Sequence, residues 1–467
     1  MQAPPGAPPA APAAVSLRPF RPALGFTFFN CLNWQVAIGS PMVLLVAALG
    51  GNAFHVGLCF AFVYLMAPIQ VLATALLPRF GFKRLMMSGW GLRALFLLPC
   101  IGLAYGARVG EPAPWRVYAM VASVFAFTFF RAFGSGAWLP WLYRLLPETA
   151  RGRYFATEQL VTGVASVVIL VTCMVLFETL PLHHAFMIEY AIAFVGAALS
   201  YLALGRMTDT EKPVTSDLAG VVRETPGICL RPGAFRAFLL VACGFGFATT
   251  AIAPLGIYYL RVESGVSPAD ILFYTMMQYA GTAVVSLVTR NEIDRRGARP
   301  FFYTAAVILG SVAAFWVALL AIGFPGRSFF PFACFALGAG AGLWAAAYQK
   351  YLPVLVPAEN RPLVLAIYGA VTAFAGGLAP VVWGLAVRGA GHGMNRSAFI
   401  AFFVFVAASM IGIVLRMRRF VFPTVVADRP DLGAVVRRPH HVFTYFITLI
   451  DSSIGPAGGE PGASPKL

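Results

Sequence analysis

Twelve apolar runs constrain this chain more than any other feature of its sequence. A helix needs about 20 mostly apolar residues to cross roughly 30 Å of hydrocarbon. Hydrocarbon offers no hydrogen-bond partners to backbone N–H and C=O groups, so such runs predict helices and not open strands. The expected fold class is an all-α membrane protein. The expected spans are 25–49, 54–77, 85–105, 115–142, 154–178, 183–205, 235–260, 269–289, 301–322, 331–352, 363–387 and 397–415.

The composition agrees with a membrane protein and excludes two other classes. Of the 467 residues, 59% are apolar and 11% are charged. Soluble domains carry about 25% charged residues, and disordered chains need low hydrophobicity. The formal net charge of +16 would suggest nucleic-acid binding in a soluble protein. In a membrane protein, the informative property of this positive charge is its distribution between the two sides of the membrane. No nucleic-acid partner is expected.

The cations alternate between the two sides of the predicted spans. If the chain starts inside, 26 Lys and Arg fall in inner segments and six in outer ones. The other two, Arg93 and Arg131, lie deeper within spans. Because Lys and Arg concentrate on the cytoplasmic side of membrane proteins, both termini are expected in the cytoplasm. The expected location is the plasma membrane, as a multi-pass protein of a bacterial inner membrane.

The chain divides into two similar halves. Three features of the first half recur in the second at nearly the same distance along the chain. Pro254 follows Pro41 by 213 residues. The segment 355–357 follows 145–147 by 210 residues, and 295–299 follows 79–83 by 216 residues. Each pair has the same place among the spans, which indicates a parallel internal repeat. The predicted organisation is a disordered tail (1–24), a six-helix bundle (25–205), a cytoplasmic loop (206–234), a second six-helix bundle (235–415) and a cytoplasmic tail (416–467).

The C-terminal tail contains a short apolar stretch, 442–450, that cannot span a bilayer. Arg437, Arg438 and two histidines precede it, so it could lie on the membrane surface. A poorly ordered tail is the other interpretation, and the sequence leaves both open.

Twelve spans, a middle loop and a parallel repeat resemble the major facilitator superfamily (MFS). The loop between spans 2 and 3 of that family reads roughly G-x-x-x-D-R-x-G-R-R, which Arg79, Gly81 and Lys83 match, whereas Pro78 replaces the acid. The matching loop of the second half keeps Asp294, Arg295 and Gly297. The resemblance implies two pseudo-symmetric bundles that these loops latch together on the cytoplasmic side. A simpler interpretation is that the loop cations only set topology.

Charged residues inside spans are costly and usually functional. Arg131 lies roughly 20 Å by helical rise from Arg144, near mid-membrane. It resembles an arginine of the family's fourth helix, which implies proton coupling or anion contact; the alternative is an ion pair with Glu158. Arg93 is expected to snorkel toward the inner interface. Glu189 is expected at the outer interface.

Uncharged polar residues recur at helical spacing in three spans. In the family these helices line a central cavity, so amides and aromatic groups there would suit a polar organic solute. The alternative is interhelical hydrogen bonding, which is common in membrane helices. The residues are Asn30 and Asn33 in span 1, Tyr274, Gln278 and Thr282 in span 8, and Tyr368 and Thr372 in span 11.

The expected function is secondary transport. No Walker A motif, catalytic triad or zinc spacing is apparent, so we expect no enzyme, cofactor or metal. The resemblance implies a transporter of a small polar organic solute that uses alternating access and is coupled to protons. Alternatives are an exporter of an amphipathic compound or lipid, and a membrane sensor or scaffold that transports nothing. The expected partners are the solute, protons and the bilayer, and the protein is expected to be a monomer.

Overall fold

The structure, a computed structural model, describes residues 17–107, 113–211, 218–322, 327–356, 361–389 and 393–422. These residues form α-helices and three short 3-10 helices, and an isolated bridge between Arg388 and Met394 is the only β pairing among them. Most of the predicted N-terminal tail and the stretch 442–450 lie outside the described residues.

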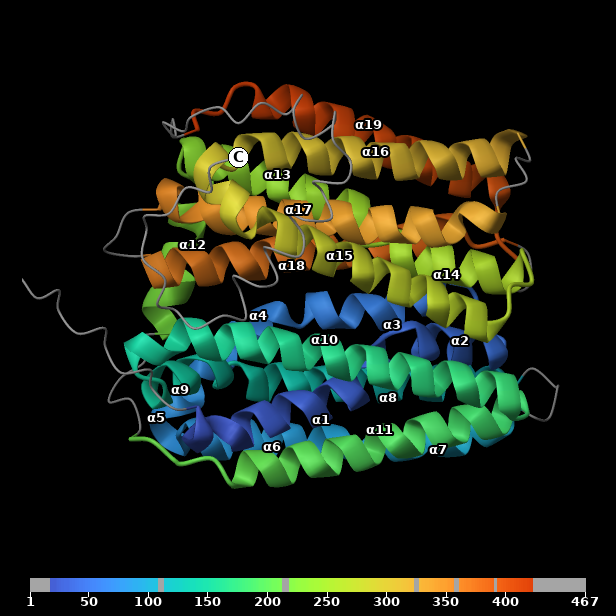
Figure 1. The fold of residues 1–467 in the computed structure, drawn as a ribbon, viewed down its shortest axis with the longest axis horizontal. Coiled ribbons are helices and arrows are strands. Elements are labelled where there is room, and N and C mark those ends of the chain that lie inside the picture. The colour runs from blue at the N-terminus through green and yellow to red at the C-terminus, as the bar shows by residue number, and fades with distance from the viewer. Residues whose placement is uncertain are drawn as a thin grey trace, which may run out of the picture.

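The first half of the chain is a group of helices that lies apart from the second half in Figure 1. Its first helix begins at Arg21, inside the predicted tail. Its helices are α1 (Arg21–Ile38), α2 (Ser40–Ala48), α3 (Ala53–Leu65), α4 (Ala67–Ala73), α5 (Leu77–Phe80), α6 (Phe82–Leu95), α7 (Leu97–Gly106), α8 (Pro114–Ser135), α9 (Trp138–Leu145), α10 (Glu148–Thr179) and α11 (Leu182–Gly205).

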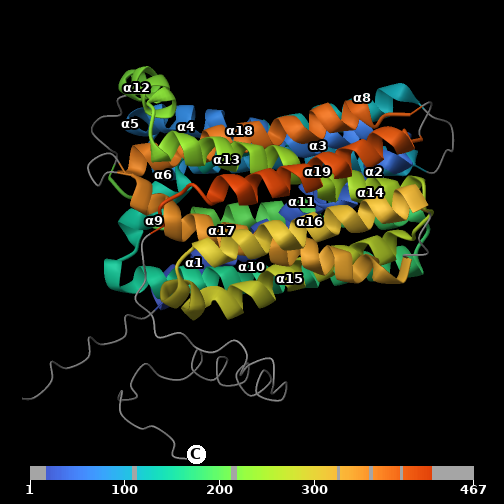
Figure 2. The same cartoon turned by 90° about the horizontal axis from the view of Figure 1, so that it is seen from above.

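The second half forms the other group, and the predicted central loop 206–234 contains a helix of its own. That helix, α12 (Leu218–Leu230), stands at one end of the molecule (Figure 2). The remaining helices are α13 (Ala234–Thr249), α14 (Ile252–Val262), α15 (Pro268–Arg296), α16 (Arg299–Ile322), α17 (Phe330–Leu355), α18 (Arg361–Ala386) and α19 (Arg396–Met417).

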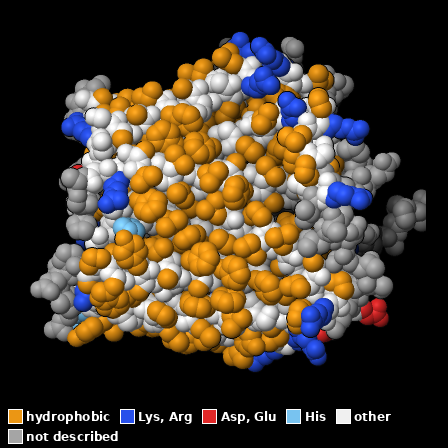
Figure 3. Space-filling model, turned by 180° about the vertical axis from the view of Figure 1, so that it is seen from behind, with side chains coloured by type: hydrophobic (Ala, Val, Ile, Leu, Met, Phe, Trp, Pro, Cys, Tyr) orange, Lys and Arg blue, Asp and Glu red, His pale blue; other side chains and the backbone are white. Residues whose placement is uncertain are grey.

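The helices correspond to the predicted spans. Among the described residues, 11 helical stretches are long and apolar enough to cross a membrane. The remaining predicted span, 269–289, is α15, which has the length but carries charged residues in its first and last turns. Apolar side chains cover the middle of the face in Figure 3, as expected for a surface in contact with lipid.

Cations gather mainly at one end of this apolar surface (Figure 3). It is the end where α5, α9 and α12 lie in Figure 1, and we call it the basic end because Arg79, Arg144 and Arg223 lie on these helices. The far end is the opposite one, where α2 leads into α3 and α14 leads into α15.

Prolines break the first span of each half at matching places. The helix stops at Gly39, two residues before Pro41, and in the second half at Thr250 and Ala251, before Pro254. Proline has no N–H, and its ring clashes with the carbonyl four residues earlier, which favours a kink or a break at these places. The matching breaks give the sequence repeat a structural counterpart.

Gly81 and Gly297 make the same turn in the two halves. Gly81 has φ +79° and Gly297 has φ +73°, with ψ of 169° and 175°. Residues with a side chain rarely adopt this conformation, so both positions favour glycine. Gly81 alone separates α5 from α6, and Gly297 with Ala298 separates α15 from α16, so each glycine reverses the chain at the basic end.

The two halves touch through α2, α3, α4 and α10 of the first half and α14, α15 and α18 of the second. The closest approach is between α3 and α18. A Cβ added to Gly57 would lie 2.0 Å from the Pro380 carbonyl oxygen, and one added to Gly377 would lie 2.8 Å from Tyr64 Cβ. Any larger side chain would therefore push the halves apart.

Candidate functional site

A cavity of about 590 Å³ lies mostly within the second half of the chain. Helices α13, α17 and α18 supply its walls, and Tyr64 of α3 is its one described contribution from the first half. Gln349, Leu352 and Pro353, in the last turns of α17, place it toward the basic end. Its volume is typical of sites for small organic ligands, which range over roughly 300–1,000 Å³.

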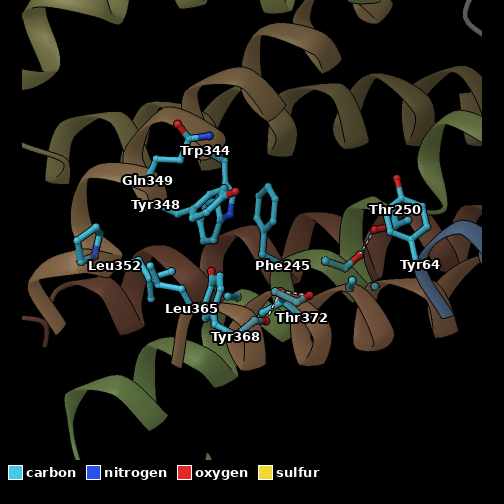
Figure 4. A pocket seen from close by; sticks show the side chains of 16 residues that line it. Tyr64, Phe245, Thr250, Trp344, Tyr348, Gln349, Leu352, Leu365, Tyr368 and Thr372 are labelled. Atoms are coloured by element: carbon cyan, nitrogen blue, oxygen red, sulfur yellow. Dashed lines mark hydrogen bonds between the residues drawn. The ribbon is translucent and has the colours of Figure 1, made fainter. Parts of the chain in front are cut away.

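Aromatic rings form much of the cavity wall (Figure 4). Phe245 of α13 stacks on Trp344 of α17, with ring centroids 3.7 Å apart and planes 4° apart. Tyr368 of α18 stacks on Phe238 behind it at 6.0 Å and also lies 6.0 Å from Tyr348. The stacking fixes the orientation of these rings, and a flat or apolar ligand could lie against them.

The polar groups of the cavity are uncharged. Among the described residues that line it, none is acidic or basic. Two threonine hydroxyls are already used, because Thr250 donates to the Gly246 carbonyl at 2.7 Å and Thr372 to the Tyr368 carbonyl at 2.7 Å. The remaining donors and acceptors are the Gln349 amide, the indole N–H of Trp344 and the hydroxyls of Tyr64, Tyr348 and Tyr368.

Hydrogen bonds between the halves close the molecule from its centre to the far end. Tyr279 of α15 donates to Gln35 Oε1 of α1 at 2.9 Å, near the cavity. Ser40 and Thr275 share a 2.6 Å hydrogen bond between their hydroxyls. At the far end, Tyr258 donates to the Gly51 carbonyl at 3.1 Å. The described contacts therefore hold the halves together beyond the cavity.

Arg131 lies in α8, which packs against α3, α4 and α6 within the first half. Its guanidinium carbon lies 4.6 Å from the centroid of the Trp34 ring. Its Nε is buried without a hydrogen-bond partner. Arg131 also lies within electrostatic range of Tyr64, the residue that the first half contributes to the cavity, but Arg131 itself is not among the lining residues.

Arg93 lies near Arg131 and is entirely buried, so the expectation that it snorkels to an interface is wrong. Its Nη2 donates to Asn30 Oδ1 and, at 3.4 Å, to Asn33 Oδ1. Its guanidinium carbon is 4.2 Å from the Trp90 ring centroid and 5.0 Å from that of Phe127. Amide dipoles and aromatic faces thus solvate this charge, since a bare charge at the bilayer centre costs about 3 kcal/mol or more.

Comparison with known proteins supports one family. The sequence model described as the Major Facilitator Superfamily matches residues 238–454. No curated protein sequence matches the chain at a significant level. The match covers a little less than half of the chain, so the sequence is similar to the major facilitator superfamily over its second half. Together with the apolar helices, this similarity indicates a multi-pass membrane transporter and not an enzyme.

Solved structures show the same MFS fold. A D-xylose–proton symporter aligns with a TM-score of 0.67 at 14% identity, covering 88% of this chain and 99% of the symporter. A nucleoside transporter aligns with a TM-score of 0.65 at 12% identity, covering 85% of this chain and 100% of that transporter. A bacterial homologue of the iron transporter ferroportin, in its inward-facing state, aligns with a TM-score of 0.65 at 12% identity. The alignment covers 87% of this chain and 99% of the homologue. At such identities the likeness shows the fold alone.

The predicted site residues of this protein fall into separate places. Tyr368 lines the cavity and Arg131 is within electrostatic range of Tyr64, whereas Asn30 and Asn33 bind Arg93 inside the first half. Gln278 lies in α15 next to a space of only about 30 Å³ within the second half. The neighbouring Thr282 donates to the Gly338 carbonyl of α17 at 3.0 Å, which is an interhelical hydrogen bond.

The carboxylates do not pair with Arg131 in the described part of the chain. Glu158 Oε1 instead accepts a hydrogen bond from the Thr27 hydroxyl at 3.1 Å. Glu189 is completely buried, beside Cys173, so the expectation of an interfacial position is wrong. Both residues lie in the first half, on α10 and α11.

The structure describes the side chains of one of the two loops expected to latch the bundles, the one with Arg79 and Lys83, more fully than those of the other. Lys83 Nζ donates to the carbonyls of Gly205 and Met207, both at 2.8 Å, at the C-terminal end of α11 in the same half. Arg79 lies 5.5 Å from the ring centroid of Phe80. The side chains of Asp294 and Arg295 lie outside the described residues.

Sequence reasoning missed most of the cavity wall. Phe245, Trp344, Tyr348 and Gln349 carry no signal that separates them from other residues of apolar spans. Tyr64 also gave no signal, because its position depends on the close approach of α3 to α18. Only the helical spacing of Tyr368 and Thr372 pointed to this surface.

Proposed function

We propose that this transporter moves a small polar organic solute by alternating access and couples the movement to protons. The observation that carries the proposal is the cavity of about 590 Å³, which lies toward the basic end while interhalf hydrogen bonds hold the far end together. A cavity that borders both halves and is closed toward one end supports a rocking transporter. Export of an amphipathic compound or lipid is the second possibility, which the aromatic walls would also serve.

The proposed orientation places the basic end and both termini in the cytoplasm of a bacterial cell, with the protein in the plasma membrane. The excess of cations at that end supports it. The cavity then faces inward in this structure. The bundles 25–205 and 235–415 would be the units that rock, joined by the segment 206–234 that contains α12.

Glu158 is our candidate for the proton-coupling carboxylate. It is partly exposed and bound by a single described hydrogen bond, from Thr27 of α1, so protonation would cost it few interactions. A carboxylate that binds and releases a proton within a span can link a proton gradient to the movement of helices. Arg131, within electrostatic range of Tyr64, is the candidate for contact with the solute.

The test is flux in proteoliposomes that contain the full chain. We expect uptake of a labelled polar solute to rise with an inward proton gradient and to fall when an ionophore dissipates it. In Glu158→Gln, gradient-driven uptake should be lost while solute exchange at equal pH persists, because exchange needs no net proton movement. Glu263→Gln, at the end of α14, is the matched control. A protein that moves no solute under any gradient would be a sensor or scaffold instead.

A further inference from the structure

Another cavity, of about 360 Å³, lies at the basic end between the start of α13 and the ends of α17 and α19. It shares no described lining residue with the cavity of the proposed solute site. Tyr351 donates a hydrogen bond to the Val421 carbonyl at 3.1 Å and so joins the end of α17 to the segment that follows α19. The proposed transport function makes no use of this cavity.

The charge of this second cavity is entirely positive among its described lining residues. Arg416 and Arg419 line it, and no acidic residue does. Both arginines are exposed, and neither side chain donates a hydrogen bond to a described residue. No side chain caps the start of α13 at Gly233, so backbone N–H groups there add further donors. Two unpaired guanidinium groups in one cavity wall favour a ligand with a negatively charged oxygen group.

Exposed apolar side chains lead along two of the helices to this cavity. On α19, Ile411 and Leu415 are exposed and precede Arg419 at steps of four residues, which places all three on one face. On α13, the exposed Leu240 follows the lining residue Ala237 by three residues. Exposed apolar side chains of a membrane-spanning helix contact acyl chains. The surfaces that approach the cavity therefore suit a ligand with an apolar tail.

We propose that this cavity binds the headgroup of an anionic phospholipid. Its phosphate binds Arg416 and Arg419, and its acyl chains lie along the exposed apolar faces of α13 and α19. Guanidinium groups bind phosphate through charge-assisted, often bidentate, hydrogen bonds. Basic pockets between spans are suited to anionic headgroups for this reason. The inference goes beyond the proposed transport function and does not depend on it.

Other occupants fit this cavity less well. A zwitterionic lipid also brings a cation, and no acidic side chain lines the cavity among the described residues to bind it. Free phosphate would use the arginines and none of the apolar surface. The C-terminal segment 423–467 has as many acidic as basic residues, four of each, and so offers no net negative charge. Arginines that only fix the orientation of the protein would not depend on the cavity at all.

The test measures lipid binding to the purified full-length protein in detergent by native mass spectrometry. The probes are dioleoyl phosphatidylglycerol, dioleoyl phosphatidylcholine and inorganic phosphate. We expect phosphatidylglycerol to bind at least about tenfold more tightly than phosphatidylcholine, and to stay bound in about a hundredfold excess of inorganic phosphate. The double variant Arg416→Gln/Arg419→Gln should weaken phosphatidylglycerol binding by at least about tenfold, and each single variant by at least about threefold.

Two further variants separate a site from a general effect of charge. Arg418→Gln is the matched control, because Arg418 is exposed between the two arginines but does not line the cavity. It should keep phosphatidylglycerol binding within about twofold of the wild type. Ala237→Trp fills the cavity without a change of charge and should weaken binding as much as the double variant.

The inference is wrong if phosphatidylcholine binds as well as phosphatidylglycerol or if neither lipid binds. It is equally wrong if inorganic phosphate displaces the lipid, because the ligand would then be free phosphate. Unchanged binding in the double variant or in Ala237→Trp would place the lipid elsewhere. A loss in Arg418→Gln equal to that in the single variants would reduce the effect to surface charge. Because no flux is measured, failure of the proposed transport function would leave each of these results unchanged.

Discussion

The two halves of this transporter share a scaffold and differ in what their centres contain. The first half has Arg93, Arg131, Glu158 and Glu189 inside its spans. In the second half, the described charged side chains lie near helix ends, and the centre presents stacked rings around a cavity. The difference suggests a division of labour, in which one half recognises charge and the other recognises shape and apolar surface.

The shared scaffold makes this difference informative. Matching proline breaks and matching glycine turns show that both halves keep the same chain path. Residues at the centre are free to differ because neither feature depends on them. A solute held between unlike surfaces would contact both halves at once, so its binding would depend on how the halves sit relative to each other.

The largest expected effect comes from preventing the halves from moving apart. The Ser40→Cys and Thr275→Cys double variant places two thiols where the hydroxyls now lie 2.6 Å apart. A disulfide there, which needs Cβ atoms about 3.8 Å apart, would lock the far end closed. We expect flux in proteoliposomes to fall by at least about a hundredfold under oxidant and to return with reductant.

Each single cysteine variant is the control for the native thiols and should keep its flux under oxidant. If the double variant forms the disulfide, as judged by mass spectrometry, and still transports normally, the halves do not rock about this interface. The comparison between the halves would then describe two static surfaces.

A smaller effect is expected on stability when the buried charge of the first half is removed. Arg93→Ala would leave a void between Trp90 and Phe127 and would deprive Asn30 and Asn33 of a donor. We expect the free energy of unfolding to fall by about 3 kcal/mol, measured by denaturant titration in mixed micelles.

Arg131→Gln is the contrasting variant, because Arg131 makes no hydrogen bond to a described residue. Its unfolding free energy should change by less than about 1 kcal/mol. Equal losses of unfolding free energy in both variants would show that both arginines have a structural role. The assignment of Arg131 to the solute would then lose its support.

The sequence predicted the helices well because each span carries its own signal. A run of apolar residues of fixed length needs no knowledge of its neighbours. The same holds for the turns, since Gly81 and Gly297 show a local requirement for positive φ. The repeat between the halves could also be read from these local features.

The site depends on neighbours, and here the sequence was less informative. An arginine within a span can snorkel or be buried, and Arg93 is buried because Asn30, Asn33, Trp90 and Phe127 surround it from three helices. Glu189 likewise lies near a helix end but under other helices. Aromatic residues in apolar spans look alike whether they face lipid, core or cavity.

The smallest expected effect concerns the paired loops at the basic end. Lys83 and Arg299 occupy matching positions of the repeat. Lys83 donates to two carbonyls at the end of α11, whereas Arg299 lies 5.7 Å from the ring centroid of Tyr303. A cation is favourable at a helix C-terminus, so Lys83→Gln should lower the unfolding free energy by about 1 kcal/mol. Arg299→Gln should cost less than about 0.5 kcal/mol, as exposed substitutions usually do.

Flux separates this capping role from the latch that the family resemblance implies. A cap within one half stabilises both transport states equally, so Lys83→Gln should leave the transport rate within about twofold of the wild type. A latch between halves favours one state, and its loss would change the rate and the balance of states. A drop of tenfold or more in Lys83→Gln with little loss of stability would therefore assign Lys83 to the latch, and the first half would then contribute to gating as well as to charge recognition.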